Sequence, residues 1–363
     1  MTKKTATSLP VVVQVVEAFG GGVFQSLSQL CNGLKDSARF VIVHDIRAET
    51  PKDFTAHFPA GTQFIHFPMG RAIKASDAKI ILPLRKLLVG LKPHVVHAHS
   101  SKAGALIRLA LLGTGIPRFY SPRGYSFEMV DSPRSKRAFY WLIERALGFL
   151  PATTVACGYA ELKDARWVSW KSTAVPNSID PDVVPAAKRT RPPMKKELHV
   201  VSSGRISPQK NFPLFCQVAT SLAHMPIRFT WVGGGSDPLP ELPSNVTVTG
   251  WLPHAEGLAR LNEGHVYLHL TSWEGLSRIL LEAMAHGFPL VVSNIPPNVE
   301  LASAGNGFIC NNAADATNAI TKLFKDNALL TKMSKASLHH LETRYNWHNA
   351  ARQWKALYKI QAE

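Results

Sequence analysis

Two successive series of short apolar segments, each alternating with helix-like segments, limit the folds open to this chain of 363 residues. The apolar segments are rich in valine and isoleucine and end near glycine or serine, as buried strands do. The stretches between them carry apolar residues at helical spacing, and strands that alternate with helices form parallel sheets covered on both faces. The expected strands are residues 11–16, 39–44, 64–67, 94–97, 119–121 and 153–157, then 198–202, 228–232, 245–249, 265–270, 289–292 and 307–310.

The repeated pattern predicts an α/β chain with two Rossmann-like domains, as the length also favours. A charged, proline-rich stretch separates the two series and is typical of a linker between domains. We therefore expect an N-terminal domain at residues 1–175, a linker at 176–197 and a C-terminal domain at 198–346. A final helix at 347–363 is expected to pack back against the first domain.

The most specific motif follows the expected strand that ends near Leu270. A loop carries Glu274 and Gly275, a helix begins near Ser277, and Glu282 lies on that helix with seven residues between the two glutamates. A helix start can hold an anionic phosphate, and a carboxylate can accept hydrogen bonds from sugar hydroxyls. The alternative is a capped helix with a solvated glutamate.

A second motif, Ser-Gly-Arg-Ile-Ser-Pro-Gln-Lys-Asn, follows the strand near residue 202 and contains Gly204, Arg205 and Lys210. Glycine permits a close approach of the backbone to a ligand. An arginine and a lysine can neutralise the negative charge that develops on a diphosphate leaving group. Taken alone, such cations are more often solvated surface residues.

Both motifs resemble those of retaining glycosyltransferases of the glycosyl transferase group 1 family (family four), namely its E-x7-E signature and its G-R-x-x-x-x-K-N loop. The resemblance implies the GT-B fold, in which two Rossmann-like domains with parallel sheets face a central cleft. It implies a nucleotide-sugar donor on the second domain and an acceptor on the first. The resemblance assigns catalysis to Arg205, Lys210 and Glu274 and donor binding to Gly204, Gly275, Leu276, Ser277 and Glu282.

Further segments extend the resemblance through the second domain. Trp251 and Leu252 correspond to the family's base-binding segment, although ordinary turns at strand ends would look the same. Many relatives have Gly-Gly before a glutamate where this chain has two prolines, so Glu300 is assigned to the donor on the resemblance alone.

In the first domain, the resemblance places Gly20, Gly21 and Gly22 near the acceptor, although the turn departs from the dinucleotide-binding fingerprint. His99 belongs to an H-x-H segment and is expected in the cleft; a metal site with His97 is the less favoured alternative, because no third ligand is visible. Arg123 stands where many relatives have a sugar-contacting histidine, which suggests a cation that faces a phosphate or acidic group. Its alternative is a structural arginine paired with Glu128 or Asp131.

The positive charge is concentrated in the first half. The chain has 41 basic and 25 acidic side chains, and residues 1–175 contain 23 and 11 of them. This excess implies an anionic partner, and the absence of nucleic-acid-binding motifs favours acidic lipid over nucleic acid. Basic and aromatic residues at 71–91 and 134–141 suit a membrane surface, although each could be an ordinary helix with a solvated basic face.

The sequence thus predicts a retaining, metal-independent hexosyltransferase that needs no cofactor beyond its UDP- or GDP-linked donor. We expect a lipid-linked or other saccharide acceptor in bacterial surface polysaccharide assembly, such as lipopolysaccharide, O-antigen or capsule. Four scattered cysteines and the lack of an apparent signal peptide favour the cytoplasm, at the inner face of the cytoplasmic membrane. The alternatives are an epimerase or hydrolase of nucleotide sugars, and a non-catalytic binding partner.

Overall fold

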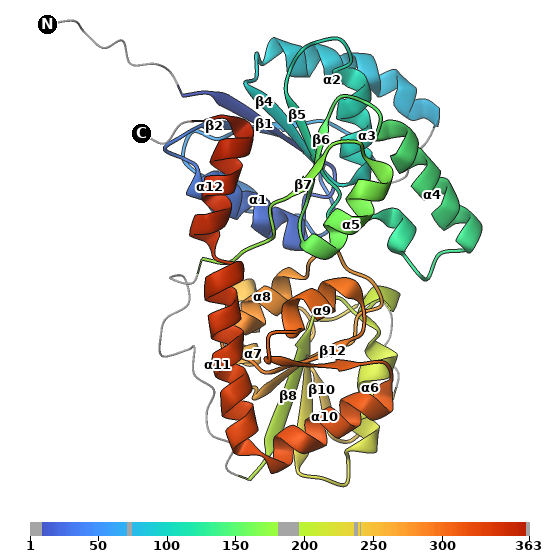
Figure 1. Ribbon diagram of the computed structural model, residues 1–363, viewed down its shortest axis with the longest axis vertical. Coiled ribbons are helices and arrows are strands. Elements are labelled where there is room, and N and C mark those ends of the chain that lie inside the picture. The colour runs from blue at the N-terminus through green and yellow to red at the C-terminus, as the bar shows by residue number, and fades with distance from the viewer. Residues whose placement is uncertain (1–8, 71–74, 181–195, 236–238, 240, 361–363) are drawn as a thin grey trace, which may run out of the picture. The chain divides into compact units, whose positions relative to one another are not determined.

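The computed structural model describes residues 9–70, 75–180, 196–235, 239 and 241–360. The chain forms two compact units (Figure 1). The first comprises Met1–Phe127, Arg134–Asn177 and His348–Glu363, and the second comprises Glu128–Pro133 and Ser178–Trp347. Most of the expected linker, residues 181–195, lies outside the described residues.

The first unit contains a seven-stranded parallel sheet in the order β3-β2-β1-β4-β5-β6-β7. Its strands are β1 (Val11–Val16), β2 (Arg39–His44), β3 (Gln63–His66), β4 (Val95–His99), β5 (Arg118–Ser121), β6 (Thr153–Ala156) and β7 (Ser172–Ala174). Its helices are α1 (Gly21–Gly33), α2 (Ala78–Gly90), α3 (Ser101–Ala110), α4 (Arg134–Leu147), α5 (Tyr159–Val168) and α12 (Trp347–Tyr358). The sequence did not indicate β7, because a three-residue strand of Ser, Thr and Ala has no apolar periodicity.

The second unit contains a six-stranded parallel sheet in the order β10-β9-β8-β11-β12-β13. Its strands are β8 (Leu198–Ser203), β9 (Ile227–Val232), β10 (Val246–Val248), β11 (Val266–His269), β12 (Leu290–Ser293) and β13 (Gly307–Cys310). Its helices are α6 (Phe212–Ser221), α7 (His254–Asn262), α8 (Arg278–Ala285), α9 (Pro296–Ala302), α10 (Ala313–Lys325) and α11 (Asn327–Arg344). The prediction of two parallel-sheet domains is confirmed.

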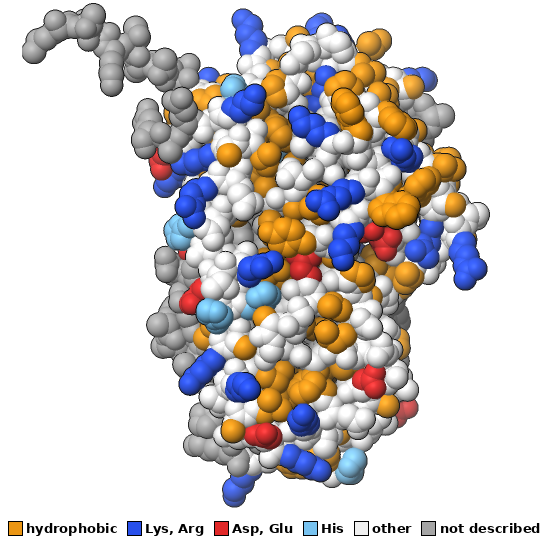
Figure 2. Space-filling model, viewed as in Figure 1, with side chains coloured by type: hydrophobic (Ala, Val, Ile, Leu, Met, Phe, Trp, Pro, Cys, Tyr) orange, Lys and Arg blue, Asp and Glu red, His pale blue; other side chains and the backbone are white. Residues whose placement is uncertain are grey.

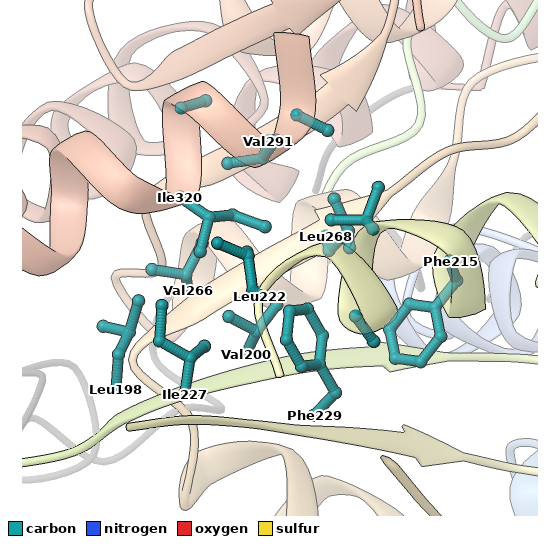
Figure 3. Packing of buried hydrophobic residues seen from close by; sticks show 14 of the residues in the cluster. Leu198, Val200, Phe215, Leu222, Ile227, Phe229, Val266, Leu268, Val291 and Ile320 are labelled. Carbon is teal, nitrogen blue, oxygen red and sulfur yellow. The ribbon is translucent and has the colours of Figure 1, made fainter. Parts of the chain in front are cut away.

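Alternation along the strands decides which face of each sheet a side chain packs against. In the second domain, Val200 and Leu268 point toward the core shared with α6 and α10, beside Phe215, Phe229 and Ile320 (Figure 3). In the first domain, Val13, Val15, Val96 and Ala98 pack against α2 and α3 in the same way.

The opposite face of the first sheet is polar at its centre and is covered by α12. The hydroxyl of Tyr358 lies 3.3 Å from Nε2 of Gln14 and 2.6 Å from Nδ1 of His97. Trp354 is buried against the His97 ring, with centroids 5.1 Å apart. Hydrogen bonds from α12 therefore satisfy polar groups that a strand centre would otherwise bury without partners.

Both sheets have the strand order of doubly wound folds, in which the chain direction across the sheet reverses beside the first strand of the domain. The reversal lies between β1 and β4 in the first sheet and between β8 and β11 in the second. Ligands of such sheets bind beyond the carboxyl ends of the strands at this reversal. The loops after β8 and β11 are therefore the natural place for a ligand in the second domain.

Candidate active site

An ion pair joins the two loops at the reversal in the second sheet. Lys210, after β8, donates through Nζ to Oε1 of Glu274, after β11, at 2.6 Å. Two hydrogen bonds from Gln209 hold the same loops together: its carbonyl accepts from the Ser272 amide at 2.9 Å, and its Nε2 donates to the Trp273 carbonyl at 2.9 Å. The two motifs, 64 residues apart in the chain, thus form one site.

The charge of Glu274 is fixed by its neighbours. Burial alone would raise the pKa of this carboxyl, but Lys210 and His269 outweigh burial and lower the pKa to about 2. Nε2 of His269 lies 3.6 Å from Oε1 of Glu274. Burial lowers the pKa of His269, so its imidazole is neutral at pH 7. The site therefore presents a carboxylate that accepts hydrogen bonds throughout the physiological pH range.

Glu282 lies one turn into α8, where Nε of Arg278 approaches its Oε1 at 3.3 Å. The hydroxyl of the buried Tyr267 has a raised pKa. Burial is the main cause, and the charges of Glu282 and Glu274 raise the pKa further. That hydroxyl lies 2.9 Å from Oγ of Ser203, at the end of β8. The charges of Glu274 and Glu282 therefore both act on Tyr267.

Gly204 begins the β8 loop in a conformation that requires glycine, with φ at +131°. Its carbonyl accepts a hydrogen bond from Nε1 of Trp231 at 3.0 Å. Its neighbour Gly233 also has positive φ, and a Cβ atom there would lie only 2.3 Å from the Gly204 carbonyl oxygen. These glycines allow the ends of β8 and β9 to approach closely, which sets the path of the chain toward Arg205 and Lys210.

The loop after β11 is held in place from β12. Its Thr271 carbonyl accepts from Oγ of Ser293 at 2.5 Å, and Nδ2 of the buried Asn298 donates to Oγ1 of Thr271 at 3.2 Å. Gly275 and Leu276 are buried, and Ser277 is the N-cap of α8 without a side-chain capping hydrogen bond. Because α8 begins at Arg278, four residues after Glu274, the start of this helix lies close to the Lys210–Glu274 pair.

Other assigned donor residues lie at the same edge of the sheet. The side chain of Arg205 is exposed directly after Gly204, and Trp251 is 63% exposed after the end of β10. Gly250, next to Trp251, pairs with Gly233 through a β-bridge, and Leu252 is half-buried. The base-binding segment therefore follows the end of β10, beside the glycine turn after β9.

Glu300 has a different setting. It lies on α9, and its Oε1 accepts a hydrogen bond from the hydroxyl of Tyr345 at 3.3 Å, just beyond the end of α11. Its carbonyl oxygen also lies 3.5 Å from Nε2 of His340. The contacts described for Glu300 link α9 to α11, and they do not join it to the group around Glu274.

In the first domain, Gly20 is the N-cap of α1, and Gly21 and Gly22 begin the helix. The sequence analysis missed Glu17, a buried carboxylate at the end of β1. It pairs with Arg47 and accepts from Oγ of Ser100, which follows β4, at 3.0 Å. A single glutamate after a run of valines is the signal that could have identified it, because a carboxylate there must lie at the strand end.

His99, the histidine expected in the cleft, is the last residue of β4. His99 has no exposed surface; its Nε2 lies 2.8 Å from Oε1 of Gln14, and its Nδ1 lies 3.2 Å from Nη2 of Arg123. Nη1 of Arg123 donates to Oδ1 of Asn177 at 2.6 Å. His99 thus helps to position Arg123, whose described bonds run to these two residues and not to Glu128 or Asp131, the partners of the alternative interpretation.

His97, the other histidine of the H-x-H segment, has a hydrogen-bond partner at each of its ring nitrogens. Its Nδ1 faces the Tyr358 hydroxyl and its Nε2 lies 3.0 Å from Oγ of Ser121. Burial lowers the pKa of both histidines well below the ordinary value. Across the described residues, no group of three or more His, Cys, Asp or Glu side chains is arranged to hold a metal ion.

Two family models match most of the chain. Residues 185–340 match the model described as glycosyl transferases group 1, and residues 21–177 match the glycosyl transferase 4-like domain. A curated relative, the Escherichia coli UDP-Gal:alpha-D-GlcNAc-diphosphoundecaprenol alpha-1,3-galactosyltransferase, is 26% identical over 299 residues, which are 74% of this chain and 76% of that protein.

Solved structures share the fold at low sequence identity. The sucrose-phosphate synthase of Thermosynechococcus elongatus is 18% identical with a TM-score of 0.77, covering 96% of this chain and 98% of that one. Anabaena Alr3699/HepE in complex with UDP and glucose is 13% identical with a TM-score of 0.74, covering 96% and 99%.

Proposed function

Since this chain belongs to the glycosyl transferase group 1 family and is a glycosyltransferase with the GT-B fold, we propose that it transfers a hexose from a UDP-linked donor to a lipid-linked saccharide. The proposed setting is bacterial surface polysaccharide assembly, with retention of the anomeric configuration. The relative from Escherichia coli supports this choice, since its name specifies UDP-Gal and a diphosphoundecaprenol-linked acceptor.

The observation that carries the proposal is the contact between Lys210 and Glu274 beside the start of α8. A nucleoside diphosphate placed there would meet the Lys210 ammonium, the Arg205 guanidinium and the first amides of the helix, all of which favour negative charge. Glu274 would lie at the sugar end of the diphosphate, where its ionised carboxylate accepts from sugar hydroxyls. Glu282 would receive the ribose hydroxyls at the other end.

The same residues explain how transfer would proceed. Charge builds up on the diphosphate as the bond to the sugar breaks, and fixed cations stabilise that charge without rearranging. In a front-face reaction, the leaving phosphate oxygen takes the proton of the attacking acceptor hydroxyl. Because Arg205 and Lys210 supply the positive charge, we propose that the reaction needs no divalent metal; activity in excess EDTA equal to activity in Mg²⁺ tests this point.

The acceptor side of the proposal places the enzyme at the inner face of the cytoplasmic membrane. On α4 and just beyond it, Phe139, Leu142 and Phe149 are 56%, 59% and 61% exposed, close in sequence to Lys136 and Arg145. Figure 2 shows Lys and Arg side chains among hydrophobic ones on the face that it draws. Helices with exposed aromatic and basic side chains are typical of peripheral membrane contact. Within the described residues, we find no helix long and apolar enough to cross a bilayer.

A panel of UDP- and GDP-sugars, incubated with and without a polyprenyl-diphosphate-linked N-acetylhexosamine, tests the function by measuring nucleotide release. We expect rapid release of UDP only when donor and acceptor are both present, with an α-linked product by NMR. The variant Glu274→Gln should reduce this rate by about 100-fold or more, as removal of one fixed charge from an active site does.

The rival functions give different results in the same assay. A hydrolase or epimerase would consume donor at the same rate without acceptor, and epimerisation would release no nucleotide. A non-catalytic binding partner would bind UDP but turn over none of the donors. A β-linked product would refute retention while leaving the transferase activity in place.

A further inference from the structure

A pocket of about 640 Å³ opens on the first domain, away from the loops described above. One wall is the second half of α2, and the other is the loop that leads into β5. Its lining residues are Leu82, Arg85, Lys86, Val89, Gly90, Thr114 and Ile116. Because β5 begins at Arg118, the pocket lies at the amino end of this strand, opposite to the end at which a transferred sugar would bind.

Among the described residues that line the pocket, the two charged ones, Arg85 and Lys86, are both basic. Nη1 of Arg85 donates to the carbonyls of Ala110 and Leu112 at 2.8 and 2.7 Å, which anchors the guanidinium at the end of α3. Lys86 is the next residue on α2 and is exposed. No carboxylate lines the described part of the pocket to balance these two charges.

A third cation, Arg118, lies behind the pocket in an unfavourable setting. Only 8% of its surface is exposed, and its Nη1 is buried with no hydrogen-bond partner among the described residues. Arg118 follows the lining residue Ile116 by two positions, at the start of β5. Burial, and then the charge of Arg85, lower the pKa of Arg118. A buried guanidinium nitrogen without a hydrogen-bond partner is costly, and an anion is a group that would satisfy it.

The rest of the pocket is suited to an apolar ligand group. Leu82 and Val89 are 73% and 43% exposed on the outer side of α2, and Ile116 lies on the opposite wall. Free phosphate would use the cations but not these side chains. We propose that the pocket binds the phosphate group of an anionic phospholipid, with Arg85, Lys86 and Arg118 around the phosphate and with Leu82 and Val89 against the glycerol and the first acyl carbons.

The test is calorimetric titration of the full-length protein with dihexanoyl phosphatidylglycerol below its micelle concentration, and separately with dihexanoyl phosphatidylcholine and inorganic phosphate. We expect phosphatidylglycerol to bind at least about fivefold more tightly than either of the others, in line with the effect of one basic group near an anionic lipid. The variants Arg118→Gln and Lys86→Glu should each weaken that binding by about fivefold or more.

Two further variants separate the possible ligands. The double variant Leu82→Ser, Val89→Ser changes exposed residues, so it should fold normally and weaken the lipid without affecting phosphate. Lys35→Gln, an exposed lysine just after α1 on the other face of the sheet, is the matched control and should bind as the native protein does. Should Arg118→Gln prove unstable by circular dichroism, Lys86→Glu still decides the question.

The proposal is overturned if Lys86→Glu binds phosphatidylglycerol as tightly as Lys35→Gln does. Equal affinity for inorganic phosphate and lipid, unchanged in the Leu82→Ser, Val89→Ser protein, would overturn the assignment to a phospholipid. Since no sugar donor is present in these titrations, they give the same answer whether or not the proposed transfer reaction is correct.

Discussion

Replacing Lys210 by methionine keeps most of the volume of the side chain and removes the cation from beside a buried carboxylate. The pKa of Glu274 is about 2, against an ordinary value of 4.5. At about 1.4 kcal/mol for each pKa unit, this difference corresponds to about 3 kcal/mol in favour of the ionised form. In Lys210→Met, burial is still present and the largest favourable charge is gone, so we expect the pKa of Glu274 to rise from about 2.

The sign of the pH dependence follows from linkage. A carboxyl whose pKa is depressed by folding stabilises the native state above its unfolded pKa, and this contribution disappears as the pH falls toward 2. Lys210→Met should therefore lower the free energy of unfolding of the second domain by about 3 kcal/mol at pH 7 and by much less at pH 3. Because the cation also faces the leaving diphosphate, kcat should fall by about 100-fold or more.

Urea unfolding at pH 7 and pH 3, followed by tryptophan fluorescence, measures this effect. Glu274→Gln and the double variant Lys210→Met, Glu274→Gln complete a double-mutant cycle, in which we expect a coupling of about 2–3 kcal/mol at pH 7. A loss of stability in Lys210→Met that is equal at the two pH values, or a coupling near zero, would refute the reasoning.

Three other predictions test separate parts of the structure. Gly233→Ala should destabilise the second domain by about 2 kcal/mol or more in urea unfolding, because its Cβ would lie 2.3 Å from a carbonyl oxygen. In the control Gly257→Ala, the Cβ would lie 3.6 Å from its nearest neighbouring atom, so this variant should be neutral or slightly stabilising. Burial is the main reason that the pKa of His199 is lowered to about 4. Between pH 6.5 and pH 4 the native protein should therefore lose about 3 kcal/mol of stability that His199→Gln does not lose. Parallel stability profiles of the two proteins against pH would contradict this. Arg123→Ala should raise the KM for the acceptor about tenfold and leave the KM for the donor unchanged, and Arg123→Lys should recover part of the loss. An unchanged acceptor KM would show that Arg123 only links His99 to Asn177.

The sequence was sufficient for the local structure and for the family. Strands such as Val11–Val16 and Leu198–Ser203 are continuous apolar runs, and such runs indicate buried parallel strands wherever they occur. The segment from Glu274 to Glu282 could be related to a family because its residue types and spacing are written directly in the chain. The short β7 escaped prediction, since its residues carry no such pattern.

What the sequence could not supply is which distant groups meet. His99 follows a buried strand like many ligand-binding residues, yet Gln14 and Arg123, from two other segments, enclose it. Glu300, which the resemblance assigns to the donor, has contacts with Tyr345 and His340, 45 and 40 residues further along the chain. These outcomes depend on side chains that pack together only after folding.

From the sequence alone came two Rossmann-like domains, a loop with Arg205 and Lys210 that is predicted to bind a diphosphate, and a loop with Glu274. Only the tertiary structure placed Nζ of Lys210 2.6 Å from the Glu274 carboxylate, left Nη1 of Arg118 buried without a hydrogen-bond partner among the described residues and formed the pocket beside α2. The physical reason is strand order: β11 pairs with β8 rather than with its predecessor β10, so loops 64 residues apart become neighbours. Local periodicity specifies the strands, whereas packing across the whole sheet decides which of them are adjacent.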